Sequence, residues 1–224
     1  MDNSRTSLLK PSGGYRKLRA FVIAQLCYDI TVRFVELYIP KNSRTTDQMV
    51  QAARSGVQNI AEGSCASATS SRTELKLTGV ACASLAELYL DYEDFLRQHE
   101  AMRWTKDHPL YKEFRRRRIS TMEQFREFIS WALTYDINHG KCSKQAAIVA
   151  NGALLLINIT RYLLNKLLQK QAEDFEQNGG FSERMMQIRL KKRKKRITVR
   201  QNGYLKIRFY NVRGVCRVRQ EGAL

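Results

Sequence analysis

The chain has 224 residues, of which 43% are hydrophobic and 27% charged, a composition that fits a folded globular protein and excludes a wholly disordered one. Lysine and arginine outnumber aspartate and glutamate by 39 to 21, which gives a net charge of +18 at pH 7. Residues 189–224 carry 13 basic residues and one glutamate, so the excess is concentrated in the C-terminal tail and the rest of the chain is mildly basic.

The first predicted element is a helix that follows a polar leader, residues 1–14. From Tyr15 the apolar side chains recur every three or four residues, which is the spacing of one helix face. Pro40 ends this helix because it lacks an amide donor and disfavours helix in the residue before it. The predicted apolar face consists of Leu18, Val22, Leu26, Ile30, Phe34 and Leu37, with Phe21 beside it.

A second helix is predicted from a cap at Thr45 or Thr46 to Gly63, which suits a left-handed C-terminal cap. It carries a narrow apolar stripe. The small residues Ala52, Ala53 and Gly56 lie within it and predict a close approach by a neighbouring helix.

A third helix is predicted from Ser71 to about Gln98, because Ser71 and Glu74 match a capping box. Its apolar face consists of Leu77, Ala81, Leu85, Leu88, Tyr92 and Phe95. Val80 and Leu90 broaden that face, which favours a central helix that contacts more than one neighbour.

Three further helices are predicted after a less regular stretch: a short one from Pro109 to Arg118, another around residues 122–132, and a long one over about 143–177. The long helix contains an apolar run of 14 residues, Ala146 to Ile159. Because a membrane span needs about 20 apolar residues, this run predicts a buried helix and no membrane contact.

In the tail the apolar residues no longer follow a helical period. They alternate with polar residues on either side of Asn202-Gly203, as Ile197, Val199, Leu205, Ile207 and Phe209 show. Asn-Gly between alternating strands is the strongest short-range signal of a β-hairpin. The predicted organisation is therefore all-α: a flexible leader over 1–14, a helical bundle over 15–188, and a basic tail with a short hairpin over 189–224.

Two stretches of this sequence resemble a bacterial four-helix-bundle family. Asp47 to Gly63 is similar to the family's signature, and Ala81 to Leu88 is similar to its third helix, which reads Ala-x-x-Ser-x-x-Glu-Leu. The family is encoded within intervening sequences of large-subunit ribosomal RNA genes, and it includes the accessory variability determinant of diversity-generating retroelements. A further stretch, Tyr162 to Met185, resembles the suffix domain at the C-terminus of one branch.

The resemblance implies an up-down four-helix bundle assembled as a homo-oligomer, commonly a pentamer, with a basic surface and no enzymatic activity. It also implies partners such as a reverse transcriptase or another nucleic-acid enzyme. The basic hairpin after Lys195 is not part of the family's pattern.

The residues themselves carry little catalytic chemistry. The sequence has no phosphate-binding glycine loop and no nucleophile elbow, and its three histidines all lie in the irregular middle section. The five cysteines are odd in number and lack a C-x-x-C pair, which favours reduced thiols in a cytoplasmic protein and no zinc site. We see no signal peptide, and we expect no enzyme and no cofactor.

Basic clusters with interleaved aromatic residues are the strongest functional signal. Lysine and arginine that meet phosphates release counterions, and aromatic faces stack exposed bases. The predicted nucleic-acid-binding residues are Lys112, Arg115, Arg116, Arg117 and Arg118 in the middle section, and Lys191, Lys192, Arg193, Lys194, Lys195, Arg196, Arg200, Tyr204, Lys206, Arg208 and Tyr210 in the tail.

Two readings of this charge stay open. The first is a non-enzymatic, oligomeric accessory protein that binds RNA or DNA through its phosphate backbone with low sequence specificity, and the family's link to ribosomal RNA genes and retroelements favours RNA. The second is a structural scaffold or protein-interaction module, in which the tail is a solvated appendage and the cluster at 115–118 faces acidic residues of a neighbouring subunit.

Overall fold

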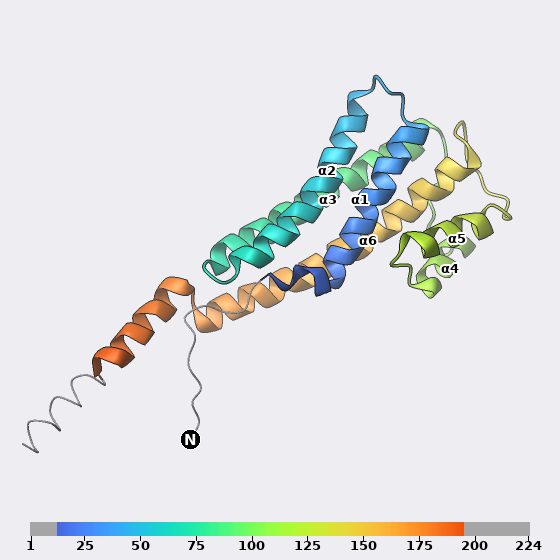
Figure 1. Cartoon of the computed structure of the whole chain (residues 1–224). Helices are drawn as coiled ribbons and strands as arrows, with labels where there is room; N and C mark the ends of the chain where they lie inside the picture. Colours follow the sequence, from blue (N-terminus) through green and yellow to red (C-terminus); the bar gives the residue numbers. More distant parts are fainter. Residues whose placement is uncertain (1–12, 195–224) are drawn as a thin grey trace, which may run out of the picture. The chain divides into compact units, whose positions relative to one another are not determined.

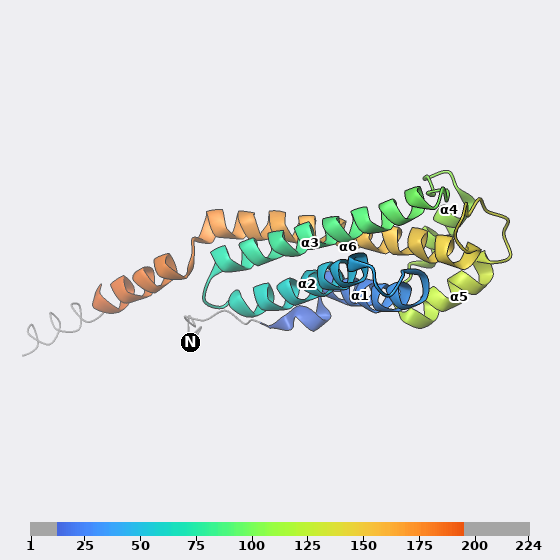
Figure 2. The same cartoon turned by 90° about the horizontal axis from the view of Figure 1, so that it is seen from above.

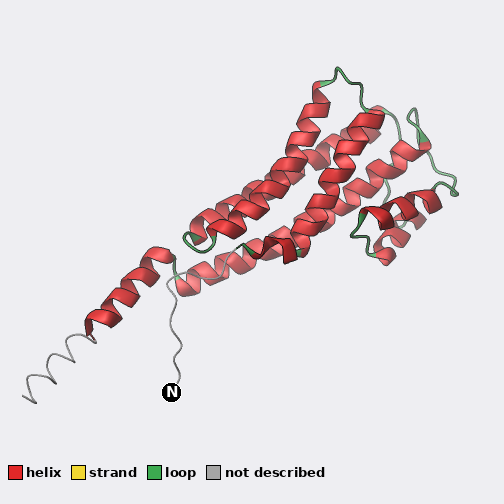
Figure 3. Cartoon of the chain, viewed as in Figure 1, coloured by secondary structure: helices red, strands yellow, loops and turns green. Residues whose placement is uncertain are grey.

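The computed structural model describes residues 13–194, and in that range every regular element is a helix (Figure 3). The all-α prediction is confirmed for these residues. The β-hairpin predicted around Asn202-Gly203 lies outside them. The elements are a short 3-10 helix η1 (Gly14–Lys17), α1 (Arg19–Tyr38), α2 (Arg44–Ala66), α3 (Ser71–Gln98), α4 (Pro109–Arg117), α5 (Met122–Ala132), α6 (Lys144–Asn178) and a last helix over 181–194.

The chain divides into two compact units, one formed by Leu9–Gln177 and one that contains the residues from Asn178 onward. Gly179 separates α6 from the last helix and has a φ of +65°, a left-handed conformation that favours glycine. Glu183 then accepts a hydrogen bond from the Gly180 amide, as the acidic partner in a capping box does. The last helix continues through Arg189, where the sequence predicted the start of the tail.

Within the first unit the long helices α1, α2, α3 and α6 lie side by side, and α4 and α5 cover one end of the group (Figures 1 and 2). Ser55 and Ser84 share a hydrogen bond between α2 and α3. Gln171 of α6 donates to Glu74 of α3. Buried side chains from α1 to α6 join in one hydrophobic core.

A buried polar contact fixes the relation between α1 and α3. The Thr31 hydroxyl donates to the Cys27 carbonyl at 2.7 Å and lies 3.1 Å from the hydroxyl of Tyr92. Because Thr31 donates its only hydroxyl proton to the Cys27 carbonyl, the Tyr92 hydroxyl donates to the Thr31 oxygen. Both side chains are fully buried, so each satisfies the other.

The helix ends differ from the predictions by a few residues. The N-caps are Ser43 for α2, which accepts from the Thr45 amide, and Ser70 for α3, which accepts from the Thr73 amide. The caps predicted at Thr45 or Thr46 and at Ser71 are therefore wrong, because an earlier serine already satisfies the free amides. Gly63 does not end α2 either: it is buried inside the helix, where a Cβ would lie 3.3 Å from Leu77 Cβ.

Four side chains predicted to face the core are exposed instead: Val22 and Leu37 on α1, and Val80 and Leu90 on α3. On α1 the buried stripe passes through Ile23, Cys27 and Phe34, so Val22 and Leu37 fall at its margins. The rest of the predicted face of α3, from Ala81 to Phe95, is buried, while Leu77 is half-buried.

The predicted apolar run of α6 is buried except at its end, where Asn158 is exposed and Ile159 is half-buried. In the described part of the chain, one helical stretch is long and apolar enough to cross a membrane, but 72% of its most apolar window is buried inside the protein. From Ala146 to Ile157 no side chain is more than 7% exposed. This is the behaviour of a core helix.

Candidate nucleic-acid interface

The arginine-rich cluster lies on α4, and the local sequence explains why this helix forms. The ring Nδ1 of His108 accepts a hydrogen bond from the Leu110 amide, and Pro109 occupies the first turn, where a missing amide costs nothing. Leu110 and Phe114 are buried, and their spacing of four residues places them on one face. The exposed basic residues of α4 lie on its other faces.

Aromatic packing attaches α4 to α5. The Phe114 ring lies 4.9 Å from the Phe128 ring and 6.3 Å from the Phe125 ring, both in edge-to-face geometry. Phe125 in turn packs over Gly152 of α6, where a Cβ would lie 2.7 Å from the ring atom Cε2. A side chain at position 152 would push α5 away from the core.

Asn151 of α6 holds the segment that leads into α4. Its Oδ1 accepts from the Trp104 amide at 2.8 Å, and its Nδ2 donates to the carbonyls of Met102 and Ala147 at 3.0 Å. Asn151 is 2% exposed, so these bonds are made away from water. These bonds fix the segment that precedes α4 to α6, the longest helix of the core.

Exposed cations form the outer surface of α4. Lys112, Arg115 and Arg118 are exposed, and none of them makes an ion pair with another described residue. Arg118 ends the helix in a left-handed conformation, with a φ of 51°, and Ile119 after it is buried. These three side chains are available to an external anion.

Glu113 neutralises part of the cluster. It accepts two hydrogen bonds from Arg116, both of 2.7 Å, and one from Arg117 at 2.8 Å. The hydrogen bonds from these guanidinium groups lower the pKa of Glu113 to about 2, so it stays ionised in any physiological solution. Arg116 remains 74% exposed and keeps a face toward solvent, as an arginine can while paired.

Arg117 has a structural environment that distinguishes it from its neighbours. Its guanidinium lies 4.6 Å from the centre of the Trp131 ring and 5.7 Å from that of Phe128, and the side chain is only 26% exposed. A cation above an aromatic face is attracted by the ring electrons. Arg117 therefore ties α4 to α5, whereas Lys112, Arg115 and Arg118 face solvent.

The second predicted cluster lies in the other unit. Lys191, Lys192, Arg193 and Lys194 are exposed at the end of the helix over 181–194. The remaining predicted residues lie outside the described residues: Lys195, Arg196, Arg200, Tyr204, Lys206, Arg208 and Tyr210.

Sequence reasoning missed two residues that shape the α4 surface, Glu113 and Trp131. The spacing of Glu113 from Arg116 and Arg117, three and four residues, is a readable signal for ion pairs on one helix. Trp131 comes from another helix and gave no such signal. Among the described residues, no three metal-binding side chains come together, and the four described cysteines are free thiols.

No protein-family model, no curated protein and no solved structure gives a significant match to this chain.

Proposed function

We propose that this protein is a non-enzymatic, cytoplasmic helical-bundle protein that binds nucleic acid, with RNA favoured, through the exposed cations of α4 and the basic segment that starts at Arg189. In this proposal it acts as an accessory factor for a nucleic-acid enzyme such as a reverse transcriptase. The observation that carries it is the α4 surface, where Lys112, Arg115 and Arg118 have no ion pair in the described part of the chain.

The support from α4 is geometric as well as electrostatic. Phe114 packs into an aromatic group, and Asn151 holds the preceding segment, so the helix presents its cations from a fixed base. A surface that is ordered before binding loses little side-chain and backbone freedom when it meets a phosphate backbone. Each phosphate contact then releases counterions and adds to the affinity.

The directions of the long helices support an up-down arrangement. Contacts pair Gly56 with Leu85 and Gly63 with Leu77, so α2 and α3 are antiparallel. Cys82 lies beside Asn165 and Glu74 beside Gln171, so α3 and α6 are antiparallel as well. We interpret α1, α2, α3 and α6 as an up-down four-helix bundle of the family that the sequence resembles, assembled as a homo-oligomer, and we propose a pentamer from the resemblance.

The test compares two sets of charge-neutralising substitutions in the full chain. One variant carries Lys112→Gln, Arg115→Gln and Arg118→Gln; the control carries Arg54→Gln, Arg72→Gln and Lys76→Gln, three exposed cations on α2 and α3. Binding to a fluorescent single-stranded RNA is measured by anisotropy. We expect the first variant to lose about tenfold in affinity or more, and the control to lose much less. Equal losses would mean that net charge alone drives binding.

A scaffold or protein-interaction module is the second candidate function, and exposed apolar side chains favour it. Leu90 on α3 is 60% exposed and Tyr162 on α6 is 62% exposed. Large apolar residues on a surface are common at protein interfaces. If the full chain binds no RNA at low salt but light scattering finds a stable oligomer, the scaffold function replaces nucleic-acid binding.

A further inference from the structure

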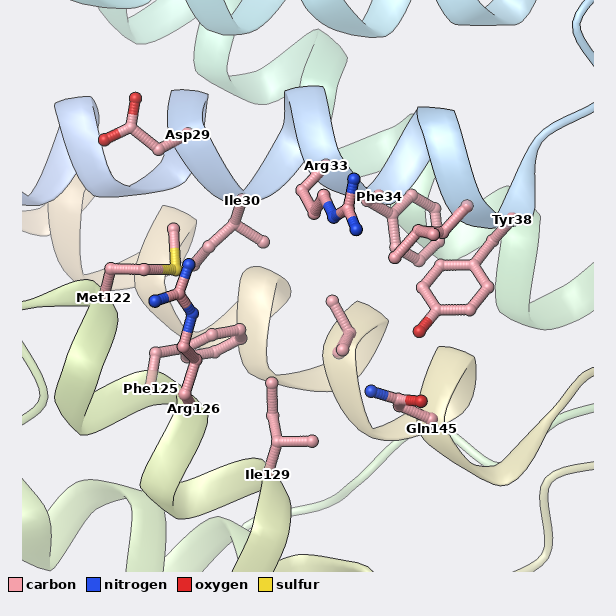
Figure 4. A pocket seen from close by; sticks show the side chains of 12 residues that line it. Asp29, Ile30, Arg33, Phe34, Tyr38, Met122, Phe125, Arg126, Ile129 and Gln145 are labelled. Atoms are coloured by element: carbon pink, nitrogen blue, oxygen red, sulfur yellow. The ribbon is translucent and has the colours of Figure 1, made fainter.

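A hollow of about 600 Å³ lies between α1, α5 and the first turns of α6 (Figure 4). Its inner wall is apolar and includes the buried side chains of Ile30, Phe34 and Phe125. Pockets that hold small organic molecules have volumes of about 300–1,000 Å³ and mostly apolar walls. None of the residues proposed above to bind nucleic acid lines this hollow.

Polar groups from three helices reach the same space. Arg126 extends from α5 toward α1, Arg33 lies on the side of α1 that lines the hollow, and the Tyr38 hydroxyl points toward Gln145 of α6 (Figure 4). Among the described residues, Arg126, Tyr38 and Gln145 have no hydrogen-bond or ion-pair partner. A few polar groups directed into an apolar hollow are what orient a bound small molecule.

The charge of the hollow favours an anion. Its one carboxylate, Asp29, makes no ion pair with either arginine in the part of the chain that the structure describes. Arg33 pairs with Glu36 at 3.0 Å, but both side chains are more than half exposed, and such a pair is weak enough to be exchanged for a better one. Guanidinium groups only donate hydrogen bonds, so an anion that replaces Glu36 and solvent would accept from both arginines.

We propose that this hollow binds a small organic anion that has an aromatic or branched apolar body and one carboxylate, sulfonate or phosphate group. The apolar body lies against Ile30, Phe34 and Phe125. Arg33 and Arg126 hold the anionic group, and the Tyr38 hydroxyl and the Gln145 amide bond further polar atoms of the ligand. This proposal does not depend on nucleic-acid binding, because it uses none of the same residues.

Two fluorescent probes that differ by one charge test the proposal. Anilinonaphthalene sulfonate has an apolar aromatic body and a sulfonate, and phenylnaphthylamine has the same ring system without the sulfonate. Both fluoresce more strongly in apolar surroundings, so each is titrated into the full chain. We expect saturable binding of both probes at one site per chain, with the sulfonate bound more tightly.

Three variants locate the site and its charge requirement. Arg33→Gln with Arg126→Gln should weaken binding of the sulfonate about tenfold or more, since each arginine contributes a charge-assisted hydrogen bond, and should change binding of the neutral probe by less than about twofold. Ile129→Trp should fill the hollow and abolish saturable binding of both probes, with the helical circular dichroism unchanged. Arg54→Gln with Arg72→Gln, which removes the same charge on α2 and α3, should bind both probes as the wild type does.

Several results would overturn the proposal. Unchanged sulfonate binding by the Arg33 and Arg126 variant would mean that the arginines do not hold the anion. An equal loss in the Arg54 and Arg72 variant would assign binding to general surface charge. If the sulfonate is displaced as protein concentration rises, in step with self-association, the hollow is instead covered by a second copy of the chain.

Discussion

A Cβ atom at Gly56 of α2 would lie 3.0 Å from both Cγ and Cδ2 of Leu85 on α3. Leu85 is fully buried, so its side chain cannot move into solvent to make room. The small patch Ala52, Ala53 and Gly56 was predicted to permit a close helix approach, and this contact confirms it. All three residues are buried. The contact lies within one chain, between α2 and α3.

The pair predicts a non-additive double-mutant cycle. Gly56→Ala should destabilise the protein by about 1–3 kcal/mol, because the added methyl group overpacks the contact with Leu85. Leu85→Ala alone should cost about 2–5 kcal/mol through the cavity that it creates. In the Leu85→Ala background the methyl group at position 56 has room, so Gly56→Ala should become neutral or stabilising. Urea unfolding measures each step.

Gly79 on α3 supplies the control for that cycle, because a Cβ there would have no neighbour within 4 Å. Gly79→Ala should therefore stabilise the protein by about 0.5–1 kcal/mol, which is the helix-propensity difference alone. If Gly56→Ala and Gly79→Ala had the same effect, the close contact with Leu85 would not exist in solution.

A second packing prediction concerns Gly152 of α6. Gly152→Ala should destabilise the protein by about 1–3 kcal/mol, since the added methyl group would lie 2.7 Å from the Phe125 ring and force α5 outward. The matched control is Ala153→Gly, which leaves Phe125 in place and should cost about 1 kcal/mol from propensity together with a small loss of buried area. Thermal unfolding compares the two. A stabilised Gly152→Ala protein would show that α5 does not pack there.

Asp91 on α3 predicts a pH dependence of stability. Its Oδ2 is buried without a hydrogen-bond partner among the described residues, and burial, with help from Glu87 and Asp94, raises its pKa from 3.8 to about 6. The folded protein therefore binds this proton more tightly than the unfolded chain does. Stability falls as pH rises from about 4 through 6, and the loss is complete above that range.

Asp91→Asn should remove this loss. At pH 7 we expect a gain of about 1 kcal/mol, a value reduced for the solvent screening around a half-exposed carboxylate, and at pH 4 we expect almost none. Asp94→Asn is the comparison: it removes only one of the charges that raise the pKa of Asp91 and also loses the hydrogen bonds from Arg97, so its gain at pH 7 should be clearly smaller. Urea unfolding at both pH values measures the difference. A gain for Asp91→Asn that is equal at the two values would contradict the raised pKa.

Substitutions of Arg115 and Arg117, two residues apart on α4, should affect different properties: the first RNA binding, the second the stability of the fold. Arg115→Gln should leave stability within about 0.5 kcal/mol of the wild type and should flatten the salt slope of RNA binding by about 0.7. Arg117→Gln should cost about 1 kcal/mol of stability, because it loses the Trp131 ring and the bond to Glu113. Unfolding and anisotropy titrations are run on both proteins. If the two variants had the same stability and the same salt slope, Arg117 would not be held against Trp131 while Arg115 faces solvent.

The sequence predicted the helical class and most helix positions because the apolar period is long and regular. It failed at helix ends, where neighbouring serines compete: Ser70 caps α3 although Ser71 matches the capping pattern. It also placed Val22 and Leu37 in the core, although both are exposed. Apolar residues at three- and four-residue spacing define a helix face, but they do not show which margin of that face other helices cover.

The candidate site was predictable only in part, for a related reason. The density of positive charge on α4 comes from consecutive residues, so it is visible in the sequence. Which cations are free depends on contacts: Glu113 on the same helix holds Arg116, and Trp131 on α5 covers Arg117. Contacts between helices follow from the tertiary fold, so no local pattern reveals them.

The central claim, that the basic surfaces bind nucleic acid through phosphates, is tested most directly by the salt dependence of RNA binding. The affinity of the full chain for a single-stranded RNA is measured by anisotropy across a range of salt concentrations. The account predicts a straight line of log affinity against log salt, with a slope of several units at about 0.7 per phosphate contact, and a flatter line when Lys191–Lys194 are all replaced by glutamine. An affinity that does not change with salt, or no binding at low salt, would contradict it.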